Sequence, residues 1–174
     1  MRPERLIPLL LGFALFVPLT WRFVRVDGAD PPRHELSMPV EGVAPGALLN
    51  TFTQARGGTR SHGALDIPAP RGTPVLATAD GVVRKLFTSV RGGLTVYQFD
   101  LEERYCYYYA HLDGYAPSLH EGQLLLRGDL IGTVGATGNA RKDAPHLHFA
   151  VIRLDPDKRW WGGTPVDPYP LLVR

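Results

Sequence analysis

The sequence predicts an all-β domain, a small antiparallel β-sheet or barrel-like sandwich, with an N-terminal hydrophobic anchor helix in front of it. Three observations support this fold class. The 174 residues include 19 glycines and 16 prolines, about a fifth of the chain, which is too many for a helical bundle or a coiled coil. After residue 38, short apolar runs alternate with turn signals at intervals of roughly ten residues. No long run there has the 3.6-residue period of a helix.

Residues 1–24 have the pattern of a signal-anchor or signal peptide. Arg2 and Arg5 precede an uncharged apolar run over residues 6–21, which Arg22 ends. This run is short for a spanning helix, which takes about 20 apolar residues, and no small-x-small cleavage site follows it. We expect an uncleaved anchor with its N-terminus inside, because the arginines come first. A cleaved segment and a buried helix of the domain are the alternatives.

The polar, proline-rich residues 25–38 are expected to form a linker, and residues 39–174 the folded domain. Four arginines and one glutamate give residues 1–26 a charge of +3, so the remaining residues carry −1 of the formal net charge of +2. The basic character therefore belongs to the N-terminal segment, and we expect no nucleic-acid partner. The single cysteine, Cys106, forms no internal disulfide and is expected to be a small buried residue.

Turn signals such as Asp80-Gly81, Asp113-Gly114 and Glu121-Gly122 divide the domain into short extended segments. Strands are expected at residues 64–67, 74–77, 81–87, 94–100, 105–112, 130–134 and 146–152. We expect these segments to pair as a small antiparallel sheet.

Histidines supply the candidate chemistry. His146 and His148 flank Leu147, so both imidazoles face one side of their strand and Leu147 faces the other. His62 and Asp66 are four residues apart, a spacing that also places them on one face. Together the two pairs offer three or four nitrogen and carboxylate ligands, a set that suits Zn²⁺.

Tyr109 and His111 form a third pair at even spacing, which predicts that they share one face of their strand. On that basis Tyr109 is a candidate substrate-binding residue. The remaining histidines, His34 in the linker and His120 in a turn, are expected to be ordinary surface residues.

Several segments in a fixed order carry a family resemblance. They are residues 61–81, which begin Ser61-His62-Gly63-Ala64-Leu65-Asp66, residues 109–112, residues 132–138, and Ala144-Pro145-His146-Leu147-His148-Phe149. Over roughly residues 39–172 the chain resembles the lysostaphin and LytM-type zinc metallopeptidases, which cut peptide bridges of bacterial peptidoglycan. It departs from the usual pattern in two places: the glycine of His-x-Gly-x-Asp is shifted by one position to Gly63, and Ala144 replaces a common glycine.

The resemblance implies that His62, Asp66 and His148 hold Zn²⁺ and that His111 and His146 are catalytic histidines outside the ligand set. Three protein ligands leave the fourth position of a tetrahedral zinc open, which is typical of a catalytic rather than a structural site. Such a metal lowers the pKa of water and polarises a carbonyl group. The sequence leaves open which of His111 and His146 is the base.

The function expected from this resemblance is a zinc endopeptidase that hydrolyses peptide cross-links in peptidoglycan stem peptides. It would act at the periplasmic face of the inner membrane, held there by the N-terminal segment, or in the periplasm if that segment is cleaved. One alternative is a non-enzymatic activator of cell-wall amidases, the role of relatives that have lost their metal ligands; another is a zinc hydrolase of small molecules. The scissile bond and any regulatory protein partner stay open.

Overall fold

The computed structural model describes residues 36–56 and 61–173. The anchor expected at residues 1–24, most of the linker and His34 lie outside them. Among the described residues, no helix is long and apolar enough to span a membrane.

In the described part of the chain, nine strands form one antiparallel sheet, which confirms the predicted fold class. The only helical segments there are the 3-10 turn η1 (Pro45–Ala47) and the one-turn helix α1 (Tyr169–Leu172). The strands are β1 (Leu65–Pro68), β2 (Pro74–Leu76), β3 (Gly81–Ser89), β4 (Gly93–Asp100), β5 (Tyr105–Tyr115), β6 (Leu124–Leu125), β7 (Leu130–Val134), β8 (His146–Arg153) and β9 (Thr164–Val166).

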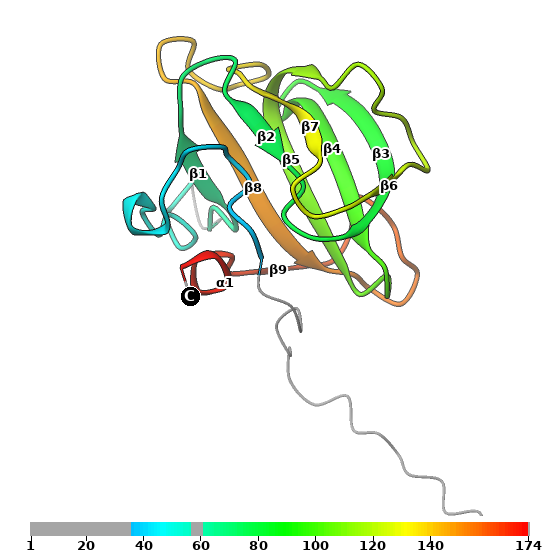
Figure 1. The fold of residues 1–174 in the computed structure, drawn as a ribbon. Coiled ribbons are helices and arrows are strands. Elements are labelled where there is room, and N and C mark those ends of the chain that lie inside the picture. Colours follow the sequence, from blue (N-terminus) through cyan, green and yellow to red (C-terminus); the bar gives the residue numbers. More distant parts are fainter. Residues whose placement is uncertain (1–35, 57–60, 174) are drawn as a thin grey trace, which may run out of the picture.

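The strands follow the order β1-β8-β5-β4-β3-β6, while β2 pairs with β7 and β9 with the outer part of β8 (Figure 1). The long strand β5 changes partner along its length. Its first half, up to Ala110, pairs with β8, and its second half, from Leu112 onward, pairs with β7. The sheet therefore divides at His111, between these two pairings.

All seven predicted strands are present, with ends that differ by at most a few residues. The two that were not predicted, β6 and β9, are very short, and β9 contains Pro165. A proline cannot donate a ladder hydrogen bond and is confined to edge positions, so residues 164–166 carry no strand signal.

The core lies on one face of β8 and its neighbours. Leu147, Phe149 and Val151 alternate along β8 and are fully buried, as is Leu65 on β1. Because side chains alternate across a strand, this burial turns His146 and His148 toward the opposite face. The same hydrophobic packing that stabilises the sheet thus fixes the direction of two histidines. Cys106 is buried, as expected.

Candidate metal centre and active site

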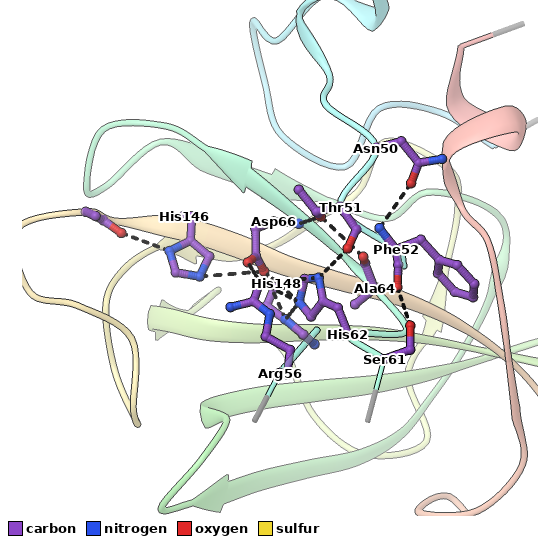
Figure 2. Close-up of polar contacts among 11 residues, drawn as sticks. Asn50, Thr51, Phe52, Arg56, Ser61, His62, Ala64, Asp66, His146 and His148 are labelled. Atoms are coloured by element: carbon purple, nitrogen blue, oxygen red, sulfur yellow. Dashed lines mark hydrogen bonds and ion pairs between the residues drawn. The ribbon is translucent and has the colours of Figure 1, made fainter. Parts of the chain in front are cut away.

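Three side chains meet at the junction of β1 and β8. Asp66 on β1 lies directly opposite His148 on β8 in the strand register, and His62 lies just before β1. His62 Nε2, His148 Nδ1 and Asp66 Oδ1 form a triangle with sides of 3.0–3.1 Å (Figure 2). The structure therefore brings together the three residues that the sequence singled out as a ligand set, and they form a group that could hold a metal ion.

The dimensions of this triangle fit zinc. Bonds of about 2.0–2.2 Å in a tetrahedral zinc site separate neighbouring ligand atoms by about 3.3 Å, close to the observed spacing. Two imidazole nitrogens and one carboxylate oxygen are also donors that zinc accepts readily. The three atoms approximate one face of a tetrahedron, which leaves the fourth direction open.

His62 is oriented by the chain before β1. Its Nδ1 lies 3.1 Å from the Thr51 carbonyl oxygen; since a carbonyl only accepts, Nδ1 carries the proton and Nε2 presents its lone pair to the triangle. The Thr51 hydroxyl accepts a hydrogen bond from the Asp66 amide. Gly63 has φ +69°, a left-handed value that glycine tolerates, and its amide donates to Phe52. The shifted glycine of the motif, Gly63, therefore allows the left-handed backbone conformation directly after His62.

His146 and His111 lie beside this triangle. The Nδ1 of His146 donates to the Ala144 carbonyl at 2.8 Å, and that of His111 to the Thr137 carbonyl at 2.9 Å. In both, the lone pair of the neutral ring is then on Nε2, and His146 Nε2 lies 3.7 Å from Asp66 Oδ1. The ring centroid of His111 lies 5.0 Å from that of His146 and 5.6 Å from that of His148. Both predicted catalytic histidines therefore lie next to the triangle.

A β-bulge directs His111 to this place. Leu94 pairs with Leu112 while Val96 pairs with Tyr109, so Ala110 and His111 together oppose a single residue of β4. His111 has φ +63°, rare for a residue other than glycine, and its amide donates to the Gly92 carbonyl. A bulge inserts one residue and changes which face the next side chains take. His111 is consequently turned to the pocket instead of the core.

The bulge overturns the predicted role of Tyr109. Tyr109 and His111 do not share a face: Tyr109 is fully buried in the core, where its ring packs against Phe149. Its hydroxyl accepts a hydrogen bond from the Thr78 amide and donates one to Gln98. Tyr109 is a core residue and not a substrate contact.

The tyrosine that faces the pocket is its neighbour Tyr108, which lies edge-on to His148. Strict alternation back from His111 predicts that Tyr109 faces the pocket. The bulge adds one residue between Tyr109 and Leu112, so Tyr108 faces the pocket instead.

Charge and burial keep the cluster in the protonation states that a metal site needs. Burial alone would raise the pKa of the Asp66 carboxyl, but its contacts with His148 and His62 hold that pKa well below its usual range. Burial lowers the pKa of His111 to about 4 and also lowers the pKa of His148. The aspartate is thus ionised and these two imidazoles neutral at pH 7, the forms that bind metals and accept protons.

The cluster opens into a pocket with a volume of about 760 Å³. Its lining residues are Ala55, Arg56, Ser61, His62, Asp66, Arg91, Gly92, Tyr108, Ala110, His111, Asn139, Ala140, Arg141, Ala144, His146 and His148. The pocket is large enough for a few residues of an extended peptide. Its arginines were not anticipated from the sequence, because they belong to no recognisable motif. His120 is exposed and away from the pocket, as expected.

The positively charged side chain of Arg56 lies against the cluster. Its guanidinium forms an ion pair with Asp66 and lies 3.2 and 3.3 Å from the two ring nitrogens of His62 (Figure 2). The nearest carboxylates in sequence to the histidines serve elsewhere: Asp113 pairs with Arg71, and Asp143 pairs with Arg141. Backbone carbonyls, which have no sequence signature, orient the histidines instead.

Comparison with known proteins agrees with this site. The L-Ala–D-Glu endopeptidase of Bacillus subtilis is 36% identical over 150 residues, which cover 82% of this chain and 44% of that protein. The first curated relatives are all much longer, and the chain spans less than half of each.

Solved structures share the fold. The catalytic domain of lysostaphin from Staphylococcus simulans superposes with a TM-score of 0.61 at 26% identity, covering 72% of this chain and 90% of that one. A zinc-containing peptidase from Vibrio cholerae has a TM-score of 0.55 at 30% identity, covering 71% of this chain and 35% of that one. Together with the donor set, this identifies the cofactor as Zn²⁺.

The profile of peptidase family M23 matches residues 60–168, which is more than half of the chain and contains every histidine and aspartate of the cluster. This chain therefore belongs to peptidase family M23.

Proposed function

We propose that the chain is a zinc endopeptidase that hydrolyses peptide cross-links of bacterial peptidoglycan. The observation that carries the proposal is the triangle of His62, Asp66 and His148, with His111 and His146 beside it. In this proposal the first three residues hold the metal, and the last two act on the substrate.

Zn²⁺ held by the three ligands would polarise the scissile carbonyl and lower the pKa of the attacking water. The chain's own residues then move protons. The Nε2 atoms of His111 and His146 carry lone pairs and are fixed by carbonyl contacts at Nδ1, so either ring can accept the proton of the water. The resulting imidazolium stabilises the negative charge that develops on the carbonyl oxygen, or returns the proton to the leaving amine.

Backbone carbonyls, and not carboxylates, accept the hydrogen bonds of the Nδ1 atoms of these two histidines. A neutral acceptor does not raise the basicity of a histidine as a carboxylate does, and burial keeps the pKa of His111 at about 4. His111 therefore stays in the proton-accepting form at neutral pH. His146 is partly exposed, at 18% of its side-chain surface, and is better placed to exchange its proton with solvent.

The proposed location follows from the substrate. Peptidoglycan lies outside the cytoplasm, and the apolar residues 6–21 would carry the domain there as a signal-anchor or a signal peptide. In the anchored form, residues 25–38 would act as the linker between the membrane and the catalytic domain.

The test uses the purified full-length chain loaded with zinc and defined cross-linked muropeptides, with the products identified by mass spectrometry. We expect cleavage that a chelator abolishes and added zinc restores. His148→Ala should lose the metal, measured by elemental analysis, whereas His146→Ala should keep it and lose turnover. His120→Ala, an exposed histidine outside the pocket, is the matched control and should behave as wild type.

Two outcomes would contradict the proposal. A wild-type chain that binds cross-linked muropeptides without cleaving them, with or without zinc, would support the non-enzymatic role of an amidase activator. Loss of zinc in His146→Ala, with zinc retained in His148→Ala, would reverse the assigned roles.

A further inference from the structure

The pocket carries more positive charge than its own carboxylate balances. Three arginines line it, Arg56, Arg91 and Arg141, but only one acidic residue, Asp66. Two of the three guanidinium groups have a carboxylate partner. Arg56 pairs with Asp66, and Arg141 forms a two-point pair with Asp143, with distances of 3.1 and 2.7 Å.

Arg91 has no such partner. It is exposed, and among the described residues no carboxylate oxygen lies within ion-pair distance of it. An arginine at a pocket rim without a carboxylate partner is free to bind an anionic group of a ligand.

Hydrogen bonds hold the backbone of Arg91 and Gly92 in place. The Arg91 carbonyl accepts a hydrogen bond from the Asn139 amide at 3.0 Å, and the Gly92 amide donates to the Ser89 hydroxyl at 2.9 Å. The Gly92 carbonyl accepts the amide of His111 at 2.8 Å. The β3–β4 turn is therefore attached to the same backbone that positions His111.

Tight packing reinforces this attachment. A Cβ atom on Gly92 would come within 2.4 Å of the Tyr108 hydroxyl, and one on Gly93 within 2.1 Å of the Thr137 hydroxyl. The turn can thus approach the pocket floor only with glycines at these positions. Arg91 is presented from a fixed base, on the His111 side of the pocket, while Arg56 stands on the His62 side.

We propose that Arg91 binds a free carboxylate of the peptide substrate, so that this site selects acidic peptides. The inference rests on the proposed function and names its substrate class. Gly92, the residue after Arg91, accepts a hydrogen bond from the His111 amide, so Arg91 lies near His111 and the bound carboxylate lies within a residue or two of the scissile bond. A planar guanidinium binds a carboxylate through two parallel hydrogen bonds, and bound Zn²⁺ adds further positive charge to the pocket.

The test compares two synthetic cross-linked peptides that differ only in a carboxylate or a carboxamide next to the scissile bond. We expect the zinc-loaded full-length chain to favour the carboxylate peptide in kcat/KM by about tenfold, mainly through KM. Arg91→Gln should remove this preference, and Arg91→Lys should retain part of it. Higher salt should weaken the preference, because the contact is at an exposed rim.

Arg153→Gln is the matched control. Arg153 is also an exposed arginine, but it lies at the far end of β8 from His146, about 20 Å along the strand. It should leave the preference unchanged.

A second measurement separates this inference from the proposed activity. Binding of both peptides to the zinc-loaded His146→Ala variant requires no cleavage, and there too the carboxylate peptide should bind about tenfold more tightly. Equal affinity for the two peptides, or a preference that survives in Arg91→Gln, would overturn the inference. Absence of cleavage by the wild type, with the binding preference intact, would instead count against the catalytic proposal alone.

Discussion

Replacing Tyr109 by phenylalanine distinguishes a core residue from a substrate contact. The change removes one hydroxyl group and leaves the ring against Phe149. In the folded chain this hydroxyl accepts a hydrogen bond from the Thr78 amide at 3.0 Å and donates one to Gln98 Oε1 at 2.8 Å. The Gln98 side chain in turn donates to the Ala79 carbonyl at 2.7 Å. Tyr109 therefore closes a hydrogen-bonded chain inside the core.

The cost of the substitution follows from burial. Tyr109, Thr78 and Gln98 are all 0% exposed, so water cannot replace the lost partner. Each buried polar group left without a hydrogen bond costs about 1–3 kcal/mol, and two are left here. We expect the free energy of unfolding to fall by about 2–6 kcal/mol, while kcat and KM of the folded enzyme stay unchanged.

Urea unfolding followed by tryptophan fluorescence, at a fixed zinc concentration, measures this change. Tyr107→Phe is the matched control, because Tyr107 lies on the same strand and face and is 3% exposed. Its hydroxyl makes no hydrogen bond with any described residue, so its removal should cost less than about 0.5 kcal/mol. An unchanged urea midpoint for Tyr109→Phe together with a raised KM would show that this reasoning is wrong.

Two further predictions concern charge in the site. Arg56→Gln should tighten zinc binding about fivefold in a chelator competition, because it removes a screened, half-exposed cation beside Asp66, whereas Arg56→Lys should change it less; weaker binding in Arg56→Gln would contradict this. The pKa of His111 is lowered to about 4 by burial, so between pH 6.5 and 4 the unfolded chain binds a proton that the folded chain does not. This stabilisation is present above pH 6.5 and is lost as the pH falls toward 4, at up to about 1.4 kcal/mol per pH unit. Urea midpoints of the zinc-free protein should show the loss, and His111→Asn should flatten it; an equal slope in both would refute the assignment.

Local patterns in the sequence were sufficient for the strands and for part of the site. Alternation in β8 predicted that His146 and His148 share a face, and the burial of Leu147 and Phe149 confirms it. The spacing of His62 and Asp66 was informative for the same reason, because a side chain's direction along a regular strand follows from the positions of its neighbours.

The tertiary structure alone decided the rest of the site. The bulge at His111 arises where β5 passes from its pairing with β8 to its pairing with β7, and no residue type in β5 predicts it. Alternation along a regular strand, with no bulge, predicted that Tyr109 lines the pocket. The three arginines at the pocket, Arg56, Arg91 and Arg141, come from loops whose approach depends on packing between distant segments.

The sequence by itself therefore predicted the fold class and two pairs of candidate metal ligands, because the strand period and the identity of metal-binding side chains are local properties. The family resemblance selected His62, Asp66 and His148 from those pairs. Which face His111 takes, which tyrosine reaches the pocket and which carbonyls orient the histidines were decided only by the folded chain. These depend on pairing between strands and on backbone groups that every residue possesses, so a single sequence carries no local sign of them.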